Sequence, residues 1–281
     1  MSRTAGGERP AGNSVQSIDR AVAILRCFSA RTPVLGISEI ARSTGLSTST
    51  AHRLLAAMQS NRLIRHTADR RYALGPLLVQ VARSGALPAT LREAALPEMH
   101  ALRDATDETV GLHELVSPTE RAVIEQVESH QPLRRTYTEI GVPLPLPYGA
   151  QGKVLLAFLS PAEREAVLAR PLEALAPGSI QDPDVLRAQL PEIRASHWAL
   201  SLSERTPGIH TVAAPLFDHT QSAIGCLSLS GPTVRLPEDR LTELAPLVRA
   251  AAWAISEALG ATDAGVRACA EAAASEQPTL S

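Results

Sequence analysis

The sequence predicts two domains, a small and mostly helical N-terminal domain and a larger α+β domain, joined by a linker helix. A chain of 281 residues is long enough for two cores. Apolar residues follow helical spacing through the first third and then alternate between β-like runs and helices. Residues 1–75 contain 11 arginines and four acidic residues, a charge of +7, so the remainder carries −9 of the total of −2. A basic module on an acidic body is typical of a polyanion-binding domain attached to a domain with another task.

The composition excludes several classes of protein. A hydrophobic fraction of 44% with 20% charged residues is typical of globular proteins. No apolar stretch reaches the roughly 18 residues of a membrane span, and Met1 to Gln16 lacks the apolar core of a secretory signal. Cys27, Cys226 and Cys269 form neither a disulfide framework nor a paired metal motif. We therefore expect a cytoplasmic protein without a membrane anchor, metal site or other cofactor.

The expected elements follow in order along the chain. We assign residues 1–13 to a disordered tail, 14–76 to the first domain, 77–90 to the linker helix, 91–260 to the α+β domain and 261–281 to a loose tail. The first domain opens with a helix over 15–29. In the second domain, helices are expected at 91–106, 150–159, 161–169, 183–196 and 237–259, and strands at 109–116, 122–127, 134–140, 212–217 and 223–230. Strands and helices mix without regular βαβ alternation, which favours an α+β domain.

The segment from Ile37 to Ala56 reads as two helices joined by a tight turn. Ser38 is the expected N-cap of the first helix, and Gly45 stands where that helix must end in a left-handed turn. Ser47 is expected to cap the second helix. The second helix has an apolar face made of Ala51, Leu54, Leu55 and Met58.

Polar residues occupy the other face of this second helix, near its N-terminus. A recognition helix places its base-reading side chains there in the major groove. The candidate DNA-contacting residues of the two helices are Ser38, Ser47, Thr48, Ser49, Thr50, His52 and Arg53. Arg53 can donate a fork of hydrogen bonds to guanine. The alternative interpretation is an ordinary helical hairpin with a polar outer face.

The residues that follow favour the DNA-binding interpretation. The stretch from Leu63 to Leu74 reads as a hairpin whose turn carries adjacent arginines. A basic hairpin directly after a helix-turn-helix is typical of a wing that lies along the DNA backbone. Arg65, Arg70 and Arg71 are expected to bind phosphates without reading the sequence.

Three blocks in this domain carry a family resemblance: Ser14 to Leu25 (SVQSIDRAVAIL), Ser49 to Leu55 (STAHRLL) and Arg71 to Pro76 (RYALGP). In order and spacing they resemble the DNA-binding domain of the IclR-type regulators. The resemblance continues through the second domain, in blocks at 91–97, 108–112, 125–129, 152–157, 207–209, 213–215 and 227–232. It implies a winged helix-turn-helix followed by a GAF-like effector-binding domain, assembly into dimers or tetramers, and a palindromic operator whose binding responds to a small effector.

The resemblance also implies where the effector binds. Cys226, Ser228 and Ser230 alternate along one strand and therefore share a face, which lines the effector pocket in the resembled family. Their alternative role is that of small core residues. Gly152 is expected at a helix N-terminus, where N–H groups can meet a carboxylate. The remaining candidates are Leu144, Leu146, Tyr148, Ser201, Ile209 and Thr211.

The chain departs from the family pattern at several of these positions. Ser201-Leu-Ser203 stands where many relatives have an acidic pair, and Thr211 stands where some have cysteine. Tyr148 occupies a segment that usually contains histidine, and it could stack on an aromatic effector. We therefore expect an organic acid or aromatic effector that differs from the small keto acids of well-known members.

Two other classes of protein remain to be weighed. An enzyme is disfavoured because the segment around Gly152-Lys153-Val154 lacks the first glycine and the Ser/Thr of a phosphate-binding loop. The histidines also lack metal-ligand spacing, and no nucleophile elbow is present. A DNA-binding protein whose second domain only oligomerises stays open; it would show no ligand effect.

Overall fold

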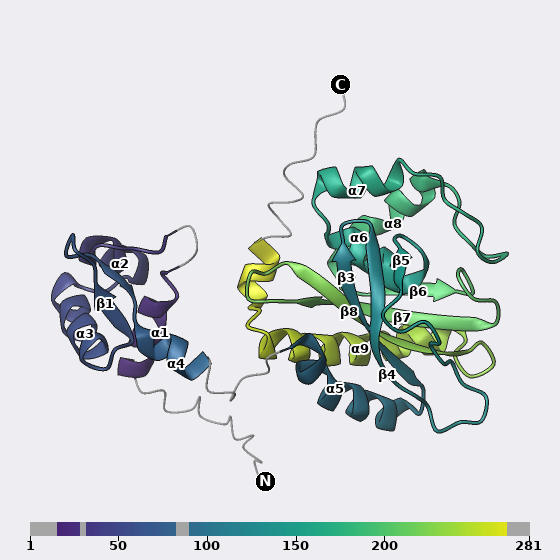
Figure 1. Cartoon of the computed structure of the whole chain (residues 1–281), viewed down its shortest axis with the longest axis horizontal. Helices are drawn as coiled ribbons and strands as arrows, with labels where there is room; N and C mark the ends of the chain where they lie inside the picture. Colours follow the sequence, from purple (N-terminus) through teal and green to yellow (C-terminus); the bar gives the residue numbers. More distant parts are fainter. Residues whose placement is uncertain (1–15, 29–31, 83–89, 269–281) are drawn as a thin grey trace, which may run out of the picture. The chain divides into compact units, whose positions relative to one another are not determined.

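The structure is a computed structural model that describes residues 16–28, 32–82 and 90–268. The chain forms two compact units, residues 1–87 and 88–281 (Figure 1). The predicted linker helix is described as far as α4 (Pro76–Ala82), because residues 83–89 lie outside the described residues. The predicted tail over 1–13 and residues 269–281 of the second tail also lie outside them. The predicted domain boundaries at 76, 90 and 260 stay predictions.

The N-terminal unit has the predicted helix-turn-helix and hairpin. Its elements are α1 (Gln16–Leu25), α2 (Ile37–Thr44), α3 (Thr48–Ser60), β1 (Ile64–His66), β2 (Tyr72–Leu74) and α4. The first helix ends at Leu25 and is shorter than the predicted 15–29. Residues of α1, α2, α3, β1 and β2 share one core. Its buried members are Ile24, Phe28, Ile40, Ala41, Ala51, Leu55, Met58, Ile64 and Tyr72. The apolar stripe of α3 is therefore buried as its spacing predicts.

Of the three predicted helix ends in α2 and α3, the one at Ser38 is wrong and those at Gly45 and Ser47 are confirmed. Gly36 is the N-cap of α2, whereas Ser38 lies inside the first turn. The cause is Glu39, whose carboxylate reaches back to accept the Gly36 N–H at 2.6 Å and satisfies a free donor of the helix end. Gly45 ends α2 with a φ of 67°. The Ser47 hydroxyl accepts the Thr50 N–H at 3.2 Å and caps α3.

Gly75 ties the wing to α4. A Cβ at this position would lie 2.2 Å from the carbonyl oxygen of Arg62, which is far inside van der Waals contact. The Gly75 N–H donates to the carbonyl of Leu63 at 2.8 Å, and the Leu77 N–H donates to that of Arg62 at 3.2 Å. Only glycine allows this close approach, so the start of α4 is held against the turn between α3 and β1.

The C-terminal unit is built on an antiparallel six-stranded sheet of order β5-β4-β3-β8-β7-β6. The strands are β3 (Thr109–Ser117), β4 (Glu120–Val127), β5 (Pro143–Pro145), β6 (Ala199–Leu202), β7 (Ile209–Phe217) and β8 (Ala223–Pro232). The helices are α5 (Leu91–Thr106), α6 (Gly149–Phe158), α7 (Pro161–Leu168), α8 (Pro183–Ser196) and α9 (Glu238–Ala258). The sheet with its helices confirms the predicted α+β class.

Helices cover both faces of this sheet. In Figure 1, α5 and α9 lie below the sheet and α6, α7 and α8 lie above it. The lower core contains Leu227 and Leu229 of β8, whereas the upper core contains Cys226 of the same strand. The predicted alternation along β8 is thus confirmed, and the face of Cys226, Ser228 and Ser230 is the face toward α6.

Three segments of this unit differ from prediction. Residues 134–140 are not a strand, because the side chain of Gln126 bonds both the N–H and the carbonyl of Tyr137 in place of a strand neighbour. No strand was predicted over residues 143–145, where the structure has β5, an edge strand in which a proline need not remove a hydrogen bond of the sheet. The short edge strand β6 was also not predicted.

The predicted loose tail after Gly260 is wrong for its first residues. Residues 263–268 are helical. Ala261 and Val266 are 6% and 3% exposed, and both pack against Phe217 at the end of β7. Their burial secures this segment to the domain. Among the described residues, no helix is long and apolar enough to cross a membrane.

Candidate DNA-binding surface and effector hollow

The exposed face of α3 presents the predicted contact residues. Thr48, Ser49, His52 and Arg53 are all exposed. Arg53 makes no hydrogen bond or ion pair with the other described residues, so its guanidinium is available to a ligand. The hydroxyl of Ser47 is engaged with Thr50, both as its cap and at 2.8 Å from its Oγ1. Ser47 therefore orders the helix start, and the outer residues of α3 remain for contact with DNA.

The wing presents its arginines unequally. Arg65 and Arg70 are exposed and make no ion pair with the described residues. Arg71 instead donates to Glu39 of α2 at 2.6 Å. This pair fixes the wing to the helix-turn-helix and makes Arg71 a structural residue as well as a candidate phosphate ligand. The hydrogen bond from Gly36 and the Arg71 guanidinium both lower the pKa of the Glu39 carboxyl.

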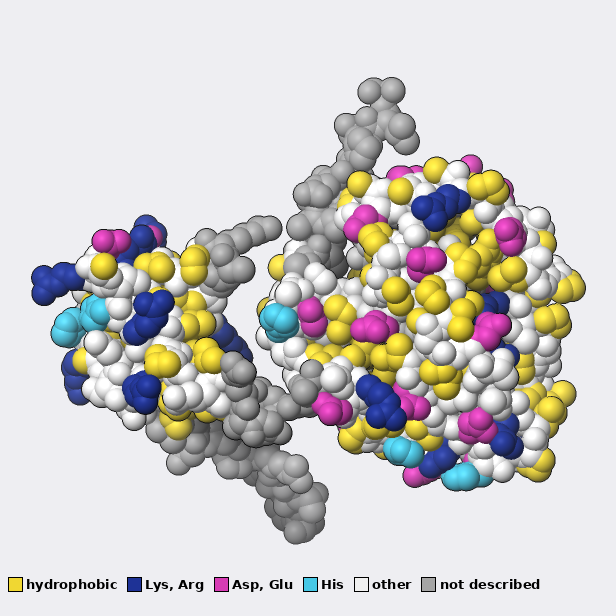
Figure 2. Space-filling view, in the orientation of Figure 1, with side chains coloured by type: hydrophobic (Ala, Val, Ile, Leu, Met, Phe, Trp, Pro, Cys, Tyr) yellow, Lys and Arg dark blue, Asp and Glu magenta, His cyan; other side chains and the backbone are white. Residues whose placement is uncertain are grey.

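Figure 2 shows the charge difference between the two units. On the visible face of the N-terminal unit, Lys and Arg side chains are spread widely and few acidic side chains appear. The visible face of the C-terminal unit mixes both signs. The structure thus places uncompensated positive charge on the unit that carries the helix-turn-helix and wing, as binding to a polyanion requires.

A small hollow lies in the C-terminal unit beneath the start of α6, and we call it the α6 hollow. Its lining is Arg135, Tyr137, Gly149, Gln151, Ser201, Arg205, Thr206, Ile209 and Thr211. The strand register aligns Ser201 with Thr211 and Thr211 with Ser230, which gives a polar row across β6, β7 and β8. The predicted residues Ser201, Ile209 and Thr211 therefore converge with residues that sequence did not single out.

Tyr137 covers the floor of this hollow. Its ring lies over Gly111, where a Cβ would come within 2.8 Å of the ring. Its hydroxyl lies 3.2 Å from Ser228 Oγ and 2.9 Å from Ser230 Oγ, and it accepts a hydrogen bond from Gln151 at 3.2 Å. Ser228 and Ser230 are almost fully buried. Tyr137 thus separates the predicted serines from the open part of the hollow.

A buried arginine and a buried histidine form a chain of hydrogen bonds that ends at Ser228, beneath the Tyr137 ring. Arg121 is 0% exposed and donates to His113 Nδ1 at 3.1 Å and to the carbonyl of Tyr148 at 3.3 Å. Because arginine can only donate, His113 Nδ1 accepts and its Nε2–H donates to Ser228 Oγ at 3.0 Å. Burial and the neighbouring Arg121 hold the pKa of His113 well below its usual value, so the ring is neutral. Burial lowers the pKa of Arg121 to about 10, which leaves it charged.

The hollow is positively charged and small. Arg135 lies with its guanidinium carbon 4.7 Å from the centre of the Tyr137 ring. Burial and the proximity of Arg135 lower the pKa of Arg205. Neither arginine forms an ion pair with a described carboxylate. The free volume is about 20 Å³, room for about one water, so a ligand requires the lining to move.

The other predicted pocket residues lie apart from the polar row. Leu144 lies in β5 opposite Arg121, and Leu146 is buried in the upper core. The Tyr148 hydroxyl accepts the Glu173 N–H at 2.7 Å, which directs it toward the loop after α7. A Cβ on Gly152 would lie 2.5 Å from the carbonyl carbon of Pro147, so close packing alone accounts for this glycine. As effector contacts, these four residues stay predictions.

Sequence reasoning missed Tyr137, His113, Arg121, Arg135 and Arg205. One sign of Tyr137 was present in the sequence. A glycine inside a predicted strand, such as Gly111, indicates close approach by another group. Nothing comparable indicates the three arginines, because Arg121 lies in β4, Arg135 and Arg205 lie in two separate loops, and their contacts form only in the folded domain.

The fold and these two sites define a class of protein: a DNA-binding regulator with a separate ligand-binding domain. Comparison with known families gives the same result. Residues 17–68 match the IclR helix-turn-helix domain, and residues 87–257 match the C-terminal domain described as bacterial transcriptional regulator IclR. The chain belongs to the IclR family. It is a DNA-binding transcriptional regulator whose C-terminal domain binds an effector, in a family of regulators rather than enzymes.

Individual relatives agree over nearly the whole chain. The acetate operon repressor of Salmonella typhimurium is 30% identical over 256 residues, which cover 90% of this chain and 93% of that protein. A crystal structure of an IclR transcriptional regulator from Silicibacter sp. TM1040 has a TM-score of 0.71 at 26% identity and covers 88% of this chain and 96% of that one. An IclR homolog from Microbacterium hydrocarbonoxydans, complexed with 4-hydroxybenzoate, has a TM-score of 0.55 at 26% identity; the coverage is 88% of this chain and 100% of that one.

Proposed function

We propose that this regulator responds to an organic carboxylate bound in the α6 hollow. The observation that carries the proposal is the pair of cations at the hollow, Arg135 and Arg205, which lack a carboxylate partner among the described residues. Arginine binds carboxylates through parallel hydrogen bonds. Ser201 brings no negative charge to the opposite wall, so nothing there repels an anion.

The effector must open the hollow in order to enter it. Tyr137 and Arg205 line the hollow, and Arg205 can move without breaking a strand ladder because it lies outside the strands. The proposal therefore requires a second state of the domain in which the hollow is wider. A carboxylate that binds only the open state shifts the population and thereby changes operator affinity. The relative bound to 4-hydroxybenzoate makes an aromatic carboxylate the first compound to test.

The test is titration calorimetry with 4-hydroxybenzoate and, as the neutral control, 4-hydroxybenzamide. Binding of the acid alone, lost in Arg205→Gln, supports the proposal. The double variant Ser228→Val with Ser230→Val should abolish the effect of the ligand on DNA binding while DNA binding by the unliganded protein persists. Equal binding of the amide, or an unchanged response in both variants, contradicts it. A regulator that binds DNA but no carboxylate would favour a second domain used only for oligomerisation.

The protein works in the cytoplasm as a homodimer or homotetramer that binds a palindromic operator, with half-sites about one helical turn apart or a multiple of it.

In the DNA-binding unit of each subunit, Arg53 reads a base and Arg70 binds a phosphate. Arg53→Ala should weaken operator binding by roughly 1–3 kcal/mol and non-specific binding much less. Arg70→Ala should weaken both equally and reduce the salt dependence. Fluorescence anisotropy at several salt concentrations separates the two, and identical losses in both variants would contradict these roles.

A further inference from the structure

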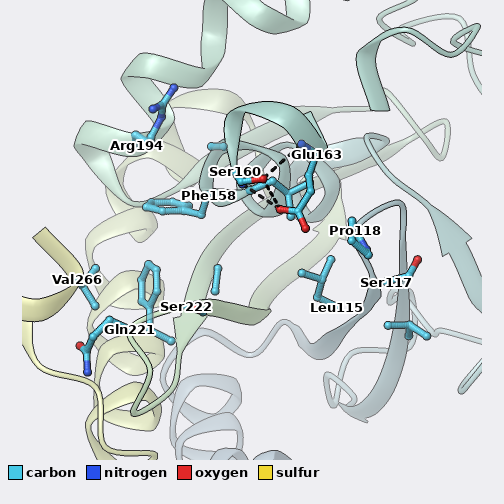
Figure 3. A pocket seen from close by; sticks show the side chains of 15 residues that line it. Leu115, Ser117, Pro118, Phe158, Ser160, Glu163, Arg194, Gln221, Ser222 and Val266 are labelled. Atoms are coloured by element: carbon cyan, nitrogen blue, oxygen red, sulfur yellow. Dashed lines mark hydrogen bonds between the residues drawn. The ribbon is translucent and has the colours of Figure 1, made fainter. Parts of the chain in front are cut away.

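A larger cavity lies at the opposite end of the β7–β8 hairpin from the α6 hollow. The hollow is formed near Thr211, at the start of β7, whereas this cavity lies at Phe217 and Ala223, the last paired residues before the turn. Its volume is about 500 Å³, within the range of small-molecule sites. Figure 3 shows Phe158 and Ser160 over the cavity, Val266 and Gln221 on one side, and Leu115 and Pro118 on the other. We call it the hairpin cavity.

Two arginines beside this cavity each have a buried nitrogen without a hydrogen-bond partner. Arg194 of α8 lines the cavity, and its buried Nε has no hydrogen-bond partner. Arg164 of α7 is 4% exposed, and its buried Nη1 is also unpartnered. Burial lowers the pKa of Arg194, and the charge of Arg164 lowers it further. Neither side chain forms an ion pair with a described carboxylate.

Such an arrangement needs a compensating group. A buried charge is costly unless it is paired, and a buried donor without a partner loses the hydrogen bonds it made to water. The one carboxylate on the cavity wall is that of Glu163, and it does not supply the pairing. It accepts the Ser160 N–H at 3.1 Å and the Ser160 hydroxyl at 2.7 Å, which caps α7.

From the cavity and its unpaired guanidinium we infer a second ligand site, specific for an amphipathic carboxylate. The apolar body lies against Leu115, Phe158, Phe217 and Val266, and the carboxylate accepts hydrogen bonds from Arg194. Val266 belongs to the helical segment over 263–268, so a ligand here contacts the end of the described chain as well as the sheet. The site is separate from the α6 hollow and does not depend on the function proposed for it.

The probe is octanoate, with octanamide as its neutral counterpart, titrated calorimetrically into the full chain. We expect one octanoate per chain, bound at least tenfold more tightly than octanamide. Arg194→Gln should bind the two compounds equally, and Ala223→Trp, which fills the cavity, should bind neither. Arg187→Gln is the matched control: it removes an α8 arginine that pairs with Glu165 at 2.8 Å, and octanoate binding should not change.

The opposite results would overturn the inference. The inference is wrong if Arg194→Gln binds octanoate as tightly as the wild type, or if Arg205→Gln is the variant that loses binding. It is also wrong if the protein binds no octanoate up to the solubility limit. A change of oligomeric mass in Ala223→Trp would assign the face to a second copy of the chain. A measurement without ligand checks that a variant still folds. Arg194→Leu removes a half-buried guanidinium whose buried Nε has no hydrogen-bond partner, and it should keep or raise the melting temperature. A lower melting temperature would show that Arg194 is already paired.

Discussion

Substitution of Gly111 by alanine tests how tightly Tyr137 is held over the floor of the α6 hollow. The new Cβ would lie 2.8 Å from Tyr137 Cε2 and 3.0 Å from Ser228 Oγ. Carbon atoms attract at about 3.5 Å or more, so the ring must shift. It is 5% exposed and tied to Ser228, Ser230 and Gln151, which leaves it little freedom. We expect Gly111→Ala to lower the free energy of unfolding by ~1–3 kcal/mol, the range for overpacked cores.

Urea unfolding followed by tryptophan fluorescence isolates this effect. Both tryptophans, Trp198 and Trp253, belong to the C-terminal unit, so the signal reports that unit alone. The measurement is repeated in two backgrounds. Tyr137→Phe keeps the ring edge but loses the hydroxyl hydrogen bonds that hold it, so Gly111→Ala should cost no more there than in the wild type. Tyr137→Leu removes the ring edge, and in that background the cost of Gly111→Ala should be lower by at least about 1 kcal/mol. This exceeds the deviation from additivity of roughly 0.5 kcal/mol that two independent sites show. Equal costs in both backgrounds would refute the contact.

Three further predictions concern single groups. Ser47→Ala should destabilise the N-terminal unit by about 1 kcal/mol, seen by far-UV circular dichroism while the tryptophan transition stays in place. The pKa of Glu39 lies below its ordinary 4.5, so the contribution of Glu39 to the free energy of unfolding is complete above pH 4.5 and is lost as the pH falls through the lowered pKa. Glu39→Gln should therefore make the unfolding of the N-terminal unit less dependent on pH in acid. An unchanged dependence would show that Glu39 contributes none of it. Burial raises the pKa of Cys226 to about 12, so a variant with Cys226 as its single thiol should react with Ellman's reagent at pH 8 only after unfolding. Rapid reaction of the native protein would show that this face is open.

The sequence was sufficient for the DNA-binding unit because its structure is specified over short distances. The turn at Gly45, the cap at Ser47 and the apolar stripe of α3 each depend on residues within one or two helical turns. The cap of α2 escaped prediction because a glutamate at the third helical position can serve a glycine as well as a serine. The pairing of Arg71 with Glu39 joins residues 32 positions apart and could not be read from spacing.

The C-terminal unit could be predicted less completely, because its pocket is formed by segments that are far apart in the sequence. Period-two alternation indicated that Cys226, Ser228 and Ser230 share a face, but only the packing of α6 decided which face of the sheet they meet. The alternation of residues describes a single strand, whereas a pocket also depends on the segments that pack on that strand. The ring that covers the serines comes from the irregular segment around Tyr137, which the side chain of Gln126 holds in place of a strand neighbour. The charge of the hollow arises because Arg135 and Arg205 converge there from separate loops, and no local pattern records a contact made only in the folded domain.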